Sequence, residues 1–80
     1  MEFNSQTTQC HLDYIGSVHY LDTYLYYCRL KNGHQEQVVG RLTIVRRTRD
    51  YFVDMHQDHL HKGFEAKIIN DSPVRLGKRL

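Results

Sequence analysis

Histidines and carboxylates gather in one short stretch of the chain, residues 54–63. The stretch holds three of the six histidines and two carboxylates, namely Asp54, His56, Asp58, His59 and His61. Zinc accepts imidazole and carboxylate ligands, and a histidine beside an aspartate can exchange protons near neutral pH. These residues are therefore the first candidates for a metal site or for general acid–base catalysis.

The surroundings of these histidines weigh against both kinds of chemistry. Their spacings match no specific zinc motif, and no cysteine lies near enough in the sequence to complete a closed site. The three serines lie in no nucleophile elbow, and neither cysteine has an activating neighbour in the sequence. We therefore expect no metal, no cofactor and no catalysis, and we expect this loop to form the rim of a binding surface.

The composition is that of one small globular domain. The 80 residues are 40% hydrophobic and 25% charged, with a formal net charge of +2. No apolar run approaches the roughly 18 residues that a membrane span needs, and the N-terminus lacks a signal-peptide pattern. We therefore expect a cytoplasmic protein without a membrane partner.

The first half of the chain predicts two paired strands. Residues 10–20 alternate between apolar and polar side chains, and residues 24–30 are rich in strand-favouring aromatics. A turn at Asp22 would leave Cys10 beyond the end of its partner strand. Because the Cα atoms of a disulfide must lie within about 7 Å, Cys10 could not then reach Cys28. We expect both cysteines to be reduced.

Two further strands follow. Asn32-Gly33 suits both positions of a type I′ hairpin turn. Residues 37–47 carry apolar side chains on both faces, which is typical of a central strand, and we expect a bulge there at Gly40. Residues 51–55 supply the fourth strand.

A helix closes the pattern. Asp58 can cap it, and Leu60, Phe64 and Ile68 follow at spacings of four. The predicted fold class is α+β, a four-stranded antiparallel meander with one C-terminal helix packed on a face. The single domain, residues 1–80, would divide into a lead-in (1–8), the meander (9–56), the helix (58–70) and a basic tail (71–80).

Residues 51–69 resemble the strand–loop–helix that binds the cofactor in the acyl-CoA N-acetyltransferase superfamily. Residues 61–64, with Gly63, would form the loop, and residues 67–69 would lie in the helix. In that family, backbone N–H groups of the loop hold the cofactor pyrophosphate, so the resemblance implies an acyl-CoA-binding domain. The chain departs from the family's loop at Leu60 and at Glu65, whose charge would oppose a phosphate. With these departures, the resemblance implies a degenerate member of that superfamily.

Tyrosines and arginines would supply a binding surface. The chain has six Tyr and no Trp, and Tyr and Arg dominate the energetics of protein interfaces. A sheet covered by one helix leaves its other face open, where we expect Ile15, Leu25 and Tyr27. The predicted protein-binding residues are Tyr24, Tyr26, Tyr27, Arg46, Arg47, Arg49, His56, His59 and His61.

The function that these features favour is non-catalytic. We expect a small binding or inhibitory module, of a kind common in viruses, phages and mobile elements, that occupies a surface of a larger protein or complex. A homodimer is a second possible assembly. The alternative is a nucleic-acid-binding domain that combines phosphate contacts with base stacking. Its basic residues would be Arg41, Arg46, Arg47, Arg49, Lys78 and Arg79.

Overall fold

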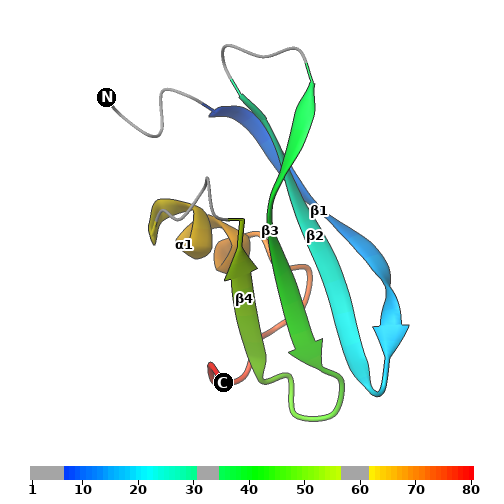
Figure 1. The fold of residues 1–80 in the computed structure, drawn as a ribbon. Helices are drawn as coiled ribbons and strands as arrows, with labels where there is room; N and C mark the ends of the chain where they lie inside the picture. The colour runs from blue at the N-terminus through cyan, green and yellow to red at the C-terminus, as the bar shows by residue number, and fades with distance from the viewer. Residues whose placement is uncertain (1–6, 31–34, 57–61) are drawn as a thin grey trace.

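In the computed structural model, one antiparallel sheet carries a single helix on one face (Figure 1). The structure describes residues 7–30, 35–56 and 62–80. The elements are β1 (Thr7–Val18), β2 (Leu21–Leu30), β3 (Glu36–Val45), β4 (Tyr51–Met55) and α1 (Lys62–Asn70). The strands lie in the order β1-β2-β3-β4, which confirms the predicted meander with a C-terminal helix. The predicted Asn32-Gly33 turn and the predicted cap at Asp58 lie outside the described residues.

The turn between β1 and β2 lies at His19-Tyr20, so the predicted turn at Asp22 is wrong. Both turn residues have positive φ, 53° and 66°, as in a two-residue type I′ turn. Val18 pairs with Leu21 across it. The prediction failed because Gly, Asn or Asp usually occupy such positions, and this turn contains none of them.

The observed turn brings the two cysteines opposite each other. Cys10 pairs with Cys28, their Cα atoms are 4.1 Å apart, and a disulfide joins them. The prediction of reduced cysteines is wrong because it assumed the turn at Asp22. With a sequence separation of 18, the bond should stabilise the fold by about 3 kcal/mol through loop entropy. Disulfides are rare in the cytosol, so this one weighs against the expected cytoplasmic location, which stays a prediction.

A bulge interrupts β3 one residue before its predicted position at Gly40. Tyr26 pairs with Gly40 and Tyr27 pairs with Val38, so Val39 is the extra residue. Val39 is fully buried, like Leu42 further along the strand. The bulge therefore explains why apolar residues of this strand do not follow a strict alternation.

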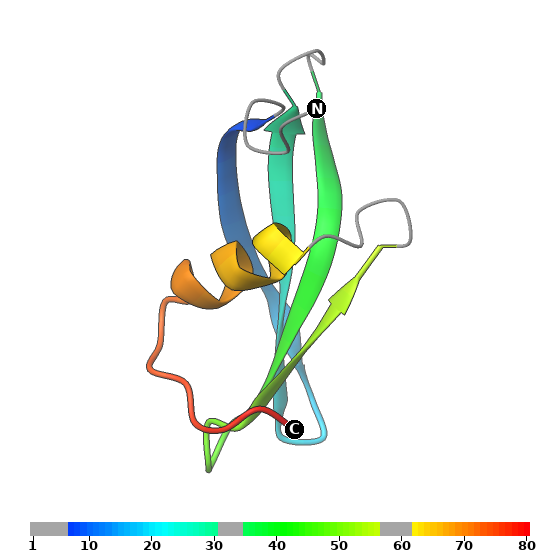
Figure 2. The ribbon, with the colours of Figure 1, turned by 90° about the vertical axis from the view of Figure 1, so that its left-hand side faces the viewer.

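The core lies between the sheet and α1, which crosses in front of the strands in Figure 2. Its buried hydrophobic residues are Tyr26, Cys28, Val39, Leu42, Ile44, Phe64 and Ile68. After the helix, Val74 and Leu76 pack against the same core. The Tyr26 hydroxyl donates to Asp71 at 2.6 Å, which ties the end of the helix to the sheet. Burial, with this hydrogen bond, raises the pKa of Tyr26 far above its ordinary value.

The C-terminal residues run beside the beginning of β4. The amide of Tyr51 donates to the carbonyl of Lys78 at 3.1 Å, and the amide of Leu80 donates to the carbonyl of Tyr51 at 2.8 Å. The amide of Gly77 donates to the carbonyl of Arg49 at 2.8 Å. The predicted basic tail is therefore part of the fold, and it covers the start of the outer edge of β4.

Gly40 lies under α1, close to the side chain of Ile68. A Cβ atom added there would lie 2.9 Å from the carbonyl oxygen of Asp54 and 2.9 Å from Cδ1 of Ile68. We expect Gly40→Ala to lower the free energy of unfolding by about 1–3 kcal/mol, measured by urea denaturation. In an Ile68→Val background, which lacks that Cδ1 atom, the same substitution should cost less. An equal cost in both backgrounds would contradict the packing of α1 over Gly40.

Candidate functional site

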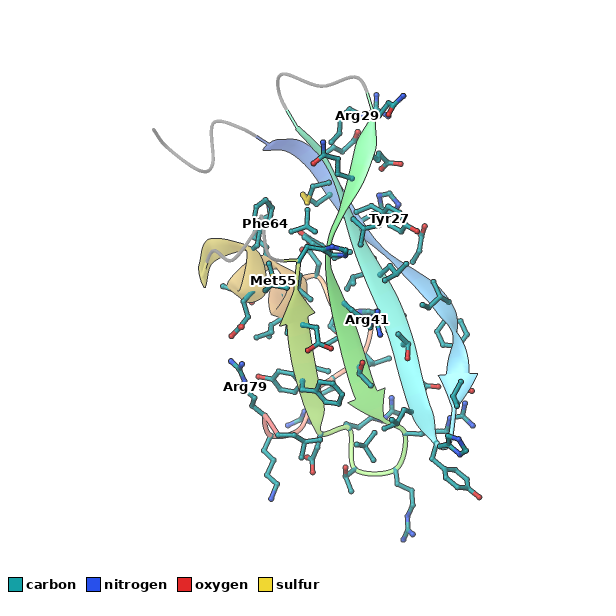
Figure 3. All side chains as sticks on the ribbon, in the orientation of Figure 1. Tyr27, Arg29, Arg41, Met55, Phe64 and Arg79 are labelled. Atoms are coloured by element: carbon teal, nitrogen blue, oxygen red, sulfur yellow. A yellow bond between two sulfur atoms is a disulfide. The ribbon has the colours of Figure 1, made fainter. Side chains whose placement is uncertain are left out.

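The sheet separates the three predicted tyrosine anchors. Tyr26 is fully buried, and Tyr24 packs against the core on the same face. Tyr27 lies on the opposite, helix-free face with Leu25, as strand alternation requires (Figure 3). Because Tyr26 has no exposed surface, a binding surface cannot use all three.

His11 forms a small polar cluster on the helix-free face. Its ring stacks on Tyr27 with centroids 5.4 Å apart and an interplanar angle of 13°. Its Nδ1 lies 3.1 Å from Oε2 of Glu36, and its Nε2 lies 3.4 Å from Oδ2 of Asp13. All three of these side chains, His11, Asp13 and Glu36, are exposed, so each contact is worth at most about 1 kcal/mol. The alternation of residues 10–20, which puts His11 and Asp13 on one face, is the signal in the sequence for this cluster.

Exposed hydrophobic side chains gather toward the turn end of the β1–β2 hairpin. Among the described residues, four of the five exposed large hydrophobic side chains lie there, namely Tyr14, Ile15, Val18 and Tyr20. Val18 is 64% exposed and Tyr20 is 80% exposed. Single exposed apolar residues are normal, but a group of them marks a candidate interaction site.

The β3–β4 turn, residues 46–50, lies beside this hairpin end (Figure 1). The amide of Arg46 donates to the carbonyl of Tyr20 at 2.9 Å. The Arg46 guanidinium donates to Oγ of Ser17 at 2.6 Å and to Oδ1 of Asp22 at 2.9 Å. The hydrogen bond between Arg46 and Asp22 lowers the pKa of the Asp22 carboxyl group, and the same hydrogen bond raises the pKa of the Arg46 guanidinium. Backbone and side-chain bonds thus hold the two turns together.

We call the combined patch the hairpin-end surface. It consists of Val18, Tyr20, Arg46, Arg47 and Arg49. Tyr14 contacts Tyr24 on the core face of the sheet, opposite to the face of Val18, and is not part of it. The three arginines were predicted from the sequence as binding residues, and all three are exposed. Val18 and Tyr20 were not predicted as anchors, because a turn at Asp22 would place both inside the first strand, paired with residues 24–30.

The remaining predicted residues lie elsewhere. His56 is exposed just after β4, where it lines an open hollow with Arg41, Asp54 and Met55. Arg41 is five residues before Arg46 along β3, a distance of about 17 Å at the usual strand rise. Arg41 therefore lies away from the β3–β4 turn and its three arginines. His59 and His61 lie outside the described residues.

The basic residues of the nucleic-acid alternative partly converge. Pairing of the C-terminus with β4 places Lys78 and Arg79 at the same end of the molecule as the β3–β4 turn. Arg79, labelled in Figure 3, forms an ion pair with Glu65. The carboxylate of Asp50 accepts from the amide of Lys78 at 3.1 Å. These carboxylates and Asp22 offset part of the positive charge.

Comparison with known proteins gives no identity to this surface. No family model, no curated protein and no solved structure matches the chain. The resemblance of residues 51–69 to an acyl-CoA-binding segment therefore stays a prediction. Within residues 7–30, 35–56 and 62–80, no cluster of His, Cys, Asp or Glu could hold a metal ion. None of the helices in those ranges is long and apolar enough to cross a membrane.

The bond between Arg46 and Asp22 makes a testable electrostatic prediction. Arg46→Ala should raise the pKa of Asp22, measured by NMR titration of its carboxyl carbon, because a charged donor to the carboxylate is lost. Since the folded-state pKa is lowered, the pair stabilises the protein above about pH 4 and loses its effect as the pH falls. Arg47→Ala, the neighbouring exposed arginine, is the control and should leave the pKa of Asp22 in place. Equal shifts in both variants would contradict the assignment.

Proposed function

We propose that the protein is a non-catalytic binding module that docks onto a larger protein through the hairpin-end surface. The observation that carries the proposal is the exposure of Val18 and Tyr20 beside the three arginines of the β3–β4 turn. Tyr and Arg are the side chains that most often contribute large binding energies at protein interfaces. Such side chains supply contact area and hydrogen bonds rather than a nucleophile or a general base.

The shape and rigidity of this end support the proposal. The molecule is elongated, 39 × 21 × 21 Å, and both turns project at one end of the long axis (Figure 1). The bonds from Arg46 to Tyr20, Ser17 and Asp22 hold the surface in one arrangement before binding. A preorganised surface loses less conformational entropy on association. A narrow projecting end of this kind suits insertion into a concave site, which is how an inhibitory module would occupy its target.

One observation favours the nucleic-acid alternative as a second candidate. Arg47, Arg49 and Lys78 are exposed at the same end of the molecule as Tyr20, as the backbone hydrogen bonds of the two turns and the C-terminus show. Cationic groups beside an exposed aromatic ring suit a single strand, whose phosphates and bases they would contact. Salt dependence separates the two candidates, because affinity for DNA falls by about one log unit per log unit of salt for each phosphate contact.

Photo-crosslinking in cells of the native host tests the proposed function. Benzoylphenylalanine at Tyr20 should give one defined crosslinked protein, since this side chain projects from the proposed surface. The same probe at Gln37, exposed at the opposite end of the sheet, should not. Introducing Val18→Asp should remove the product at Tyr20. No protein adduct at Tyr20, or the same adduct from both positions, would refute the docking surface, and a nuclease-sensitive adduct would support the alternative.

A further inference from the structure

We propose that β1 pairs with β1 of a second copy of this chain, antiparallel, about a two-fold axis at Leu12. The pairing would join two sheets into one continuous sheet. The inference goes beyond the proposed function, because it concerns the free edge of β1 and needs none of the side chains at the tip of the hairpin. Four features of the structure support it.

The two edges of the sheet differ in what lies beside them. β1 and β4 are the outer strands. The C-terminal residues pair with the beginning of β4 through Tyr51. Among the described residues, no strand or tail lies on the outer side of β1 (Figure 1). An open edge is a template for pairing with another chain.

The geometry of the disulfide pair shows which backbone groups β1 presents outward. Directly opposite residues of antiparallel strands have Cα atoms about 5.5 Å apart in hydrogen-bonded pairs and about 4.5 Å apart in the others. The 4.1 Å separation of Cys10 and Cys28 identifies a pair without backbone hydrogen bonds. Since the two kinds alternate, the N–H and C=O groups of Cys10, Leu12 and Tyr14 point away from β2. These three residues can therefore bond to another strand.

Irregularities limit the part of β1 that can pair. The register with β2 shifts between Thr7 and Gln9 and again between Tyr14 and Gly16. Gly16 has a φ of 124°, which L-residues rarely adopt. Bulges of this kind end regular pairing at a sheet edge. The regular edge is therefore residues 9–14, and Leu12 lies near its middle.

The side chains of this stretch are complementary to themselves. With the axis at Leu12, the two copies of Leu12 face each other, and Cys10 faces Tyr14 of the second copy. Tyr14 is 54% exposed in the single chain, so pairing would cover it. On the other face, His11 would lie opposite Asp13 of the second copy, once on each side of the axis. Apolar groups thus meet apolar groups, and an imidazole meets a carboxylate.

Neighbouring registers lack this complementarity. An axis at Asp13 would place the two Asp13 carboxylates directly opposite, and like charges in that position are destabilising. An axis at His11 would place the two imidazoles opposite each other and Asp13 opposite Gln9. Of these three registers, only the axis at Leu12 pairs apolar groups on one face and an imidazole with a carboxylate on the other, which is why we assign the edge to a second copy rather than to an unrelated strand.

Sedimentation velocity over a range of protein concentrations tests the pairing. The wild-type protein should dimerise. His11→Glu should raise the dimer dissociation constant about tenfold, because it places two like-charge pairs across the interface. His11→Glu combined with Asp13→Lys should restore the dimer, since each glutamate then faces a lysine. Circular dichroism confirms that each variant is folded.

A backbone substitution gives a second, independent comparison. Leu12→Pro removes an N–H group that β2 does not use, so it should abolish the dimer while the sheet persists. If Leu12→Pro does not fold, the charge reversal still decides the question. A wild-type monomer at every concentration up to about 1 mM would overturn the inference. So would a dimer that tolerates His11→Glu but dissociates on Tyr20→Ser, and neither result would alter the crosslinking test at Tyr20.

Discussion

The two-residue turn at His19-Tyr20 is the constraint on which the rest of the structure depends. It fixes the register of β1 against β2, and a shift of one residue would move every side chain of a strand to the other face. In the observed register, Cys10 meets Cys28 and can form the disulfide. The same register directs Leu12 to the core face and His11 to the helix-free face. One local geometry thus determines the cross-link, the covered face and the exposed edge.

The turn also has a cost that its surroundings must offset. A residue other than glycine with positive φ is held in a sparsely populated conformation, at about 1–3 kcal/mol each. The disulfide stabilises the same hairpin by a comparable amount, about 3 kcal/mol. The amide of Arg46 adds a hydrogen bond to the carbonyl of Tyr20, and its guanidinium binds Asp22 just after the turn. Strain held in place by such contacts often marks a functional region, and here it presents Tyr20 to solvent.

Periodicity predicted the elements of this fold well, but not their register. The alternation in residues 10–20 and the aromatic run in residues 24–30 reflect a sheet with one buried side, and that signal is local. The turn residues, His19 and Tyr20, are weaker turn signals than Gly, Asn or Asp, so local chemistry pointed to Asp22 instead. The features that depend on the register of β1 against β2 were therefore lost, including the disulfide and the exposed hydrophobic group.

Long-range contacts explain the other differences between the expected and the observed sites. Alternation alone separates Tyr26 from Tyr27, yet only the packing of α1 decides which of them is buried. Likewise, the cluster of arginines at residues 46–49 was predicted from the sequence, but its position beside Tyr20 follows from the order of the strands. Amide hydrogen exchange of β1, followed by NMR at low and high protein concentration, tests the register and the open edge together. The amides of His11 and Asp13 should be protected at every concentration, and that of Leu12 should exchange freely in dilute solution and become protected as concentration rises. A protected Leu12 amide in dilute solution, or an unprotected Asp13 amide, would contradict this account.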